Sequence, residues 1–125
     1  MTTWITICDT CKRPDLAADP SMRQPGLAFA EMIESAAIGS AHVKTRRVSC
    51  LMGCKRGCNV AIQAEGKLAY TIGDFVPSTE AAEGIVAYAE AHAGSKTGQV
   101  PMRDWPTAIK GHFITRHPPL PTEDE

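Results

Sequence analysis

Five cysteines in two clusters constrain this chain more than any other feature. The clusters are Cys8-x2-Cys11 and Cys50-x3-Cys54-x3-Cys58. The N-terminal residues 1–4 lack the charged and apolar regions of a secretion signal, so clustered cysteines predict metal or redox ligands before disulfides. An odd number of cysteines also fits a closed disulfide framework poorly. The sequence therefore directs the search for function to these thiols.

The composition predicts one ordinary globular domain. The chain has 125 residues, of which 43% are hydrophobic and 22% charged. No apolar run is long enough to span a membrane, and a net charge of -1 argues against a nucleic-acid partner. We therefore expect a cytoplasmic protein that binds neither membrane nor nucleic acid.

Hydrophobic periodicity predicts a short series of strands and helices. The order expected is a strand, a helix, a strand, a hairpin about Glu65-Gly66 and a second helix that begins at the N-cap Ser78. The ranges are Trp4–Ile7, Leu27–Ile38, Val43–Ser49, Val60–Ala64 with Lys67–Ile72, and Ser78 to about His92. This order is typical of a thioredoxin-like α/β domain with a small mixed sheet and two main helices.

A proline-rich extension follows the second helix. We expect Trp105, Ile109, Phe113 and Ile114 to pack there as a short helix, and both tryptophans, Trp4 included, to lie in the core. The domain is expected to comprise residues 1–117, with 118–125 as a mobile acidic tail. The four histidines show no ligand spacing and are expected at the surface.

Both cysteine clusters follow the C-terminal ends of expected strands, and adjacent strand ends meet at one edge of an α/β sheet. Four thiolates there form a tetrathiolate site, for which three occupants stay open. Zinc accepts four thiolates, although x3 spacing is less typical of its half-sites. A [2Fe-2S] cluster takes two thiolates on each iron, and a [4Fe-4S] cluster usually takes one dense run of cysteines.

The segment from Cys50 to Gly57, CLMGCKRG, resembles the C-L-x-x-C-x-x-G-P loop of thioredoxin-like [2Fe-2S] ferredoxins and of the small iron–sulfur subunit of respiratory NADH dehydrogenase. The resemblance implies that Cys50 and Cys54 are ligands and that Cys8 matches the first ligand in placement. Cys58 stands where those loops commonly have proline, which leaves it as a fifth or alternative ligand. The fourth ligand is then Cys11, whereas those ferredoxins place theirs further along the chain. The resemblance also implies a one-electron carrier, not an enzyme, and a homodimer.

The whole chain, over roughly residues 3–120, resembles a family of small bacterial proteins described only as predicted metal-binding. The shared features are the two cysteine clusters, the Gly66 hairpin and the segment Arg116-x-Pro118-Pro119. Because genes of that family often lie among those for aerobic cobalamin synthesis, the resemblance implies a link to cobalamin biosynthesis.

Basic residues gather around the cysteines. Six of the 13 lysines and arginines lie within four positions of one, namely Lys12, Arg13, Arg46, Arg47, Lys55 and Arg56. Such a basic rim favours the docking of an acidic redox partner protein.

Two other functions remain open on the same residues. A non-redox zinc or metal-handling protein uses the same four thiolates, and a thiol–disulfide oxidoreductase uses Cys8-x2-Cys11 as a dithiol. The latter is disfavoured because Pro14 and Pro20 argue against the helix that activates such a thiol. No Ser/His/Asp set, phosphate-binding loop or paired-carboxylate motif indicates an acid–base catalyst.

Overall fold

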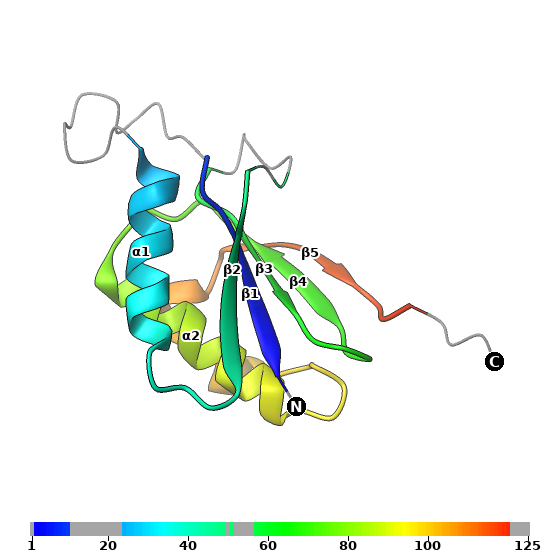
Figure 1. The fold of residues 1–125 in the computed structure, drawn as a ribbon. Helices are drawn as coiled ribbons and strands as arrows, with labels where there is room; N and C mark the ends of the chain where they lie inside the picture. The colour runs from blue at the N-terminus through cyan, green and yellow to red at the C-terminus, as the bar shows by residue number, and fades with distance from the viewer. Residues whose placement is uncertain (1, 11–23, 50, 52–56, 121–125) are drawn as a thin grey trace.

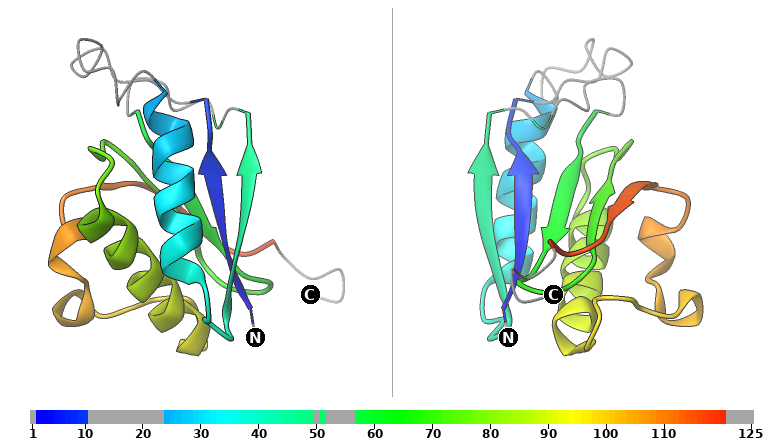
Figure 2. Two further views of the ribbon diagram at one scale, coloured as in Figure 1. Left: turned by 60° about the vertical axis from the view of Figure 1, so that its left-hand side comes forward. Right: turned by 90° about the vertical axis from the view of Figure 1, so that its right-hand side faces the viewer.

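The fold is described from a computed structural model that covers residues 2–10, 24–49, 51 and 57–120. The chain forms a two-layer α/β domain, in which both helices cover one face of a five-stranded sheet (Figure 1 and Figure 2). The elements in chain order are β1 (Thr3–Cys8), α1 (Pro25–Ala37), β2 (Val43–Val48), β3 (Val60–Gln63), β4 (Ala69–Ile72), α2 (Thr79–Gly94), two short 3-10 helices (Met102–Asp104 and Thr107–Ile109) and β5 (Phe113–His117).

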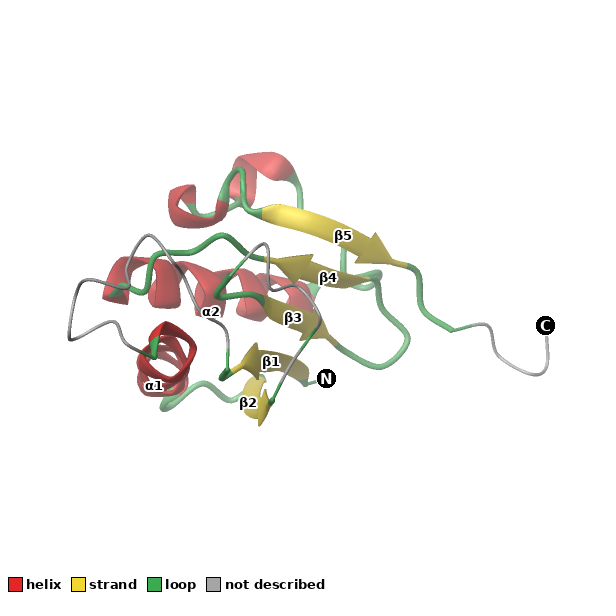
Figure 3. Cartoon of the chain, turned by 90° about the horizontal axis from the view of Figure 1, so that it is seen from above, coloured by secondary structure: helices red, strands yellow, loops and turns green. Residues whose placement is uncertain are grey.

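The sheet is mixed, with the strand order β2-β1-β3-β4-β5. β1 and β2 are parallel and are joined through α1, whereas the β1–β3, β3–β4 and β4–β5 pairs are antiparallel. This confirms the predicted small mixed sheet with two main helices in a single α/β domain. Figure 3 shows that the described helices leave the opposite face of the sheet uncovered.

The predicted strands and helices up to residue 94 are confirmed, with ends that differ by a few residues. The β-branched alternation of Thr3–Cys8 sends Ile5 and Ile7 into the core, and both are at most 1% exposed. The second helix begins as predicted, because the Ser78 side chain accepts a hydrogen bond from the Ala81 N–H at 3.1 Å.

The predicted short helix around Trp105 is wrong. Pro101 and Pro106 each precede a single 3-10 turn, and the chain then reverses at Gly111, whose φ is +84°. Phe113 and the residues after it instead extend as β5 and pair with β4 at the edge of the sheet. The expected tail from residue 118 lies largely outside the described residues, and its mobility stays a prediction.

The apolar core fills the space between the sheet and its two helices. Ile62 and Ile72 from the sheet meet Phe29 and Ile33 from α1 and Ile85 from α2, and all five are at most 1% exposed. Burial of these side chains is the main driving force that holds the two layers together.

The prediction that all four histidines lie at the surface is wrong for His92, which is fully buried near the end of α2. Its Nε2 lies 2.7 Å from the Leu68 carbonyl oxygen and its Nδ1 lies 2.9 Å from the Thr3 hydroxyl. Nε2–H therefore donates to the carbonyl, and in the neutral ring Nδ1 accepts from the hydroxyl. The Lys67 ammonium donates to the carbonyl oxygens of His92 and Ala93 at 2.9 and 2.7 Å. One cluster thus ties β1 and the residues just before β4 to the end of α2.

Burial lowers the pKa of His92, and the neighbouring Lys67 charge acts in the same direction. The folded pKa of His92 lies below the unfolded value of about 6.5. The neutral, buried ring therefore contributes fully to stability above the unfolded pKa, and this contribution is lost as the pH falls from there through the folded pKa. We expect the free energy of unfolding, measured by urea denaturation, to fall between about pH 7.5 and pH 5.5. His92→Gln should shrink that difference, while His42→Gln, at an exposed histidine, should leave it unchanged. An equal pH dependence in His92→Gln and the parent would contradict this account.

A second prediction concerns Gly98, which packs against the same cluster. Its φ is +84°, and a β-carbon there would lie 2.7 Å from His92 Nε2 and 3.0 Å from the backbone of Leu68. Gly111 has the same φ, but a β-carbon there would meet nothing within 4 Å. Gly111→Ala should therefore lower the free energy of unfolding only by the backbone strain, about 1–2 kcal/mol. Gly98→Ala should lower it distinctly more, because the added β-carbon also clashes with its neighbours. Equal losses of unfolding free energy for the two variants would show that the close packing at Gly98 has no energetic weight.

Candidate metal centre

The described termini of both cysteine segments lie at the same end of the sheet, where β1 and β2 finish and β3 begins. Cys8 is the last residue of β1, β2 ends two residues before Cys50, and Cys58 comes two residues before β3. The Cys8 N–H donates to the Asn59 carbonyl at 3.2 Å, and the Asp9 N–H donates to the Val48 carbonyl at 3.0 Å. The described ends of both segments are therefore joined by backbone hydrogen bonds at the upper end of the sheet in Figure 1.

Cys8 is buried, with 2% of its surface exposed. Along β1, Cys8 follows Trp4 and Thr6 at intervals of two residues, so its side chain belongs to the same face as theirs, opposite Ile5 and Ile7. Its sulfur lies 3.9 Å from the Thr10 hydroxyl. The thiol is thus held at the strand end, shielded from water and on the face that the described helices do not cover.

Cys58 is in a different environment. It is 1% exposed and packs within the apolar core, and its φ of +60° is in the left-handed region that few non-glycine residues adopt. The burial is what a spare thiol in the core would show, and its role as a fifth or alternative ligand stays untested.

The remaining predicted ligands, Cys11, Cys50 and Cys54, lie outside the described residues, as do Lys12, Arg13, Lys55 and Arg56 of the predicted basic rim. Within the ranges that the structure covers, no group of three or more His, Cys, Asp or Glu side chains is placed to hold a metal ion. The full ligand set therefore stays a prediction.

The two described arginines of the predicted rim point to opposite faces of β2. Arg47 forms a paired contact with Glu34 of α1, with Nε–Oε2 and Nη2–Oε1 distances of 2.8 and 2.5 Å. Its hydrogen bonds and charge lower the pKa of the Glu34 carboxyl. Arg46 instead donates to the Thr6 hydroxyl at 2.7 Å and to Gln63 Oε1 at 3.2 Å. Arg46 thus places its charge on the same face of the sheet as Cys8, while the charge of Arg47 is balanced by α1.

Trp4 lies on this helix-free face too, which corrects its assignment to the core. Its ring is 38% exposed, and the Lys44 ammonium lies 5.8 Å from the ring centre. The pairing of Trp4 with Lys44 across β1 and β2, and of Thr6 with Arg46, was not predicted. Only the register of the two strands reveals it.

A family model matches residues 5–119 and carries the description "Protein of unknown function (DUF1636)". The chain belongs to the DUF1636 family. The match includes all five cysteines and runs from β1 to just beyond β5, so the DUF1636 domain and the fold described above coincide. No curated protein and no solved structure matches the chain. Neither helix of this DUF1636 domain, within the residues described, is long and apolar enough to cross a membrane.

Proposed function

We propose that this protein is a one-electron carrier that holds a [2Fe-2S] cluster through Cys8, Cys11, Cys50 and Cys54. The proposal depends on one observation: the described termini of both cysteine segments are neighbours at one end of the sheet. There the Cys8–Asn59 and Asp9–Val48 hydrogen bonds join their described ends. A bound cluster supplies the electron transfer, by exchange of one electron with a partner.

The chemistry of the described residues fits this group. Cys8 and Cys58 are equally buried, but Cys8 lies on the sheet face opposite the apolar core, where a bound metal would neutralise a thiolate that is costly to desolvate alone. Cys58 packs within the apolar core, which supports the choice of the other four cysteines as ligands. The chain's part is to hold the Cys8 sulfur rigidly at a strand end and to exclude water from it.

Arg46 has a further role in the proposal. Its guanidinium donates a hydrogen bond to the Thr6 hydroxyl, and Thr6 lies two residues before Cys8 on the same face of β1. A fixed positive charge there favours the more negative, reduced state of a thiolate-bound cluster. It also leaves a basic group on the helix-free face for an acidic redox partner.

Zinc is the second candidate, because four thiolates serve it equally well. The protein is then a structural or metal-handling domain with no electron to transfer. A [4Fe-4S] cluster and a thiol–disulfide oxidoreductase are weaker alternatives. The homodimer, the cytoplasmic location and the link to cobalamin biosynthesis stay predictions that follow from composition or resemblance.

The deciding experiment is an optical spectrum with iron, sulfide and zinc analysis on protein purified without oxygen. We expect about two irons and two sulfides per chain, with a visible charge-transfer spectrum that dithionite bleaches. One zinc per chain and a colourless protein would overturn the electron-carrier proposal in favour of the zinc domain. A metal-free protein that reduces disulfides would point to the oxidoreductase.

The ligand set is tested by Cys8→Ser against Cys58→Ser, a matched pair of buried cysteines. Cys8→Ser should lose most of the iron, and Cys58→Ser should retain it with some loss of stability from the buried hydroxyl. Circular dichroism of each variant separates loss of metal from loss of fold. If Cys58→Ser strips the metal while Cys11→Ser does not, the ligand set is wrong.

A further inference from the structure

A cavity of about 440 Å³ lies between β4, β5 and the segment that follows α2. Its size is within the range of sites for small organic ligands. Tyr70 of its lining pairs with Ile62 on β3, which in turn pairs with Ile5, whereas Cys8 is bonded to Asn59. Tyr70 therefore shares the helix-covered face of the sheet with Ile5, whereas Cys8 belongs to the opposite face of β1, and β3 separates β1 from β4. The cavity is thus a different site from the proposed metal centre.

One part of the cavity is an aromatic wall. The rings of Trp105 and Phe113 lie 4.5 Å apart at 32°, and Tyr70 meets Phe113 edge-on at 5.6 Å. Trp105 is fixed in place because its Nε1–H donates to the Val100 carbonyl at 2.8 Å. Met102 lies at the rim and is 65% exposed, so its flexible thioether is available to cover a bound ring.

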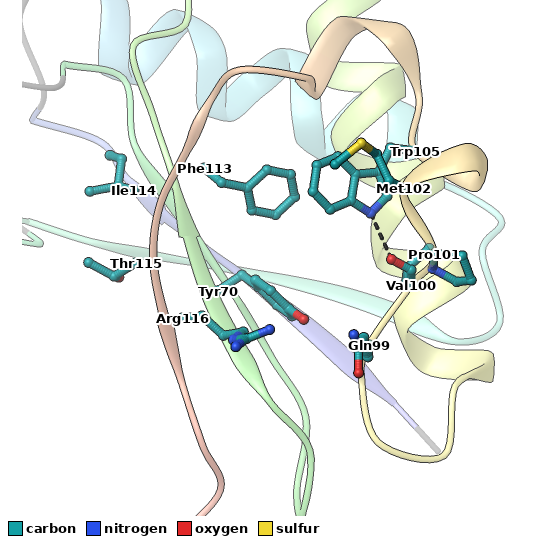
Figure 4. A pocket seen from close by; sticks show the side chains of 10 residues that line it. All are labelled: Tyr70, Gln99, Val100, Pro101, Met102, Trp105, Phe113, Ile114, Thr115 and Arg116. Atoms are coloured by element: carbon teal, nitrogen blue, oxygen red, sulfur yellow. Dashed lines mark hydrogen bonds between the residues drawn. The ribbon is translucent and has the colours of Figure 1, made fainter.

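The other part of the cavity is polar. Figure 4 shows Gln99 and Arg116 away from the Trp105–Phe113 pair, with the Tyr70 ring between the two groups. Arg116 is exposed and pairs in register with Tyr70, and within the described part of the chain it forms no ion pair with a carboxylate. The backbone of Gln99 is held by Ser95 and Thr97, and its side-chain amide forms no hydrogen bond to another described residue. A guanidinium and an amide thus remain available to a ligand.

We propose that this cavity binds a small aromatic carboxylate, with the ring against Trp105 and Phe113 and the carboxylate on Arg116 and Gln99. A planar guanidinium matches the two oxygens of a carboxylate, and the amide adds a donor to the same group. The positive charge of Arg116 disfavours cationic aromatic ligands, which the rings alone would accept. The volume holds one or two rings with a short side chain.

The test uses the fluorescence of Trp105 in a full-length Trp4→Phe protein, since Trp4 is the other tryptophan and lies on the opposite face of the sheet. The probe is 3-phenylpropionate, and the matched neutral probe is 3-phenylpropanol. We expect 3-phenylpropionate to change the emission saturably and to bind about tenfold more tightly than the alcohol.

Two arginine variants separate a specific contact from general charge. Arg116→Gln should abolish the preference for the acid over the alcohol, while Arg103→Gln, at an exposed arginine outside the cavity lining, should preserve it. Equal affinity for acid and alcohol, an equal loss in both variants, or the absence of a saturable response to 3-phenylpropionate would overturn the proposal. The metal content is measured on the same samples, so a failure here is distinguishable from a failure of the electron-carrier proposal.

Discussion

The structure depends on the two-sided pairing of β1. This strand is parallel to β2 over its whole length on one side and antiparallel to β3 over residues 4–7 on the other. A parallel neighbour requires the crossover through α1, and an antiparallel one requires the chain to return from the far end. The combination places α1, β2 and β3 around β1. It also brings the end of β1, the end of β2 and the start of β3 to one edge, where both cysteine segments begin or end.

The sequence predicts those parts of the fold that local patterns encode. Alternation in β1 and the Ser78 cap of α2 are local, and both predictions are confirmed. Ile85, Ala89 and His92 lie on one face of the helix, so their spacing indicates that His92 is buried. The prediction missed this because histidine is polar and was assigned to the surface. β5 had no such signal, because its partner β4 is some forty residues away and Phe113 and Ile114 are adjacent apolar residues that fit a helix as well as a strand.

The candidate sites divide in the same way. The sequence predicts that both cysteine clusters follow strand ends, and the structure shows that the described ends of the two segments are neighbours. Three of the four predicted ligands, however, lie outside the residues that the structure describes. The cavity at Trp105 and Arg116 was not predicted, because it is assembled from β4, β5 and a turn segment. Arg46 and Arg47 lie on opposite faces of β2 because successive side chains of a strand point in opposite directions. Counting basic residues near the cysteines along the sequence does not show this difference.

The two outermost strands of the sheet determine how copies of this protein can meet. β2 carries Lys44 and Arg46 on its helix-free face, and β5 ends in Arg116 and His117 before two prolines that have no N–H to donate. Clustered like charges and prolines at an edge oppose the addition of a further strand. The two edge strands therefore protect the sheet against edge-to-edge pairing with other copies of the chain. For two copies of this domain, the packing of surfaces is thus favoured over the continuation of one sheet through two chains.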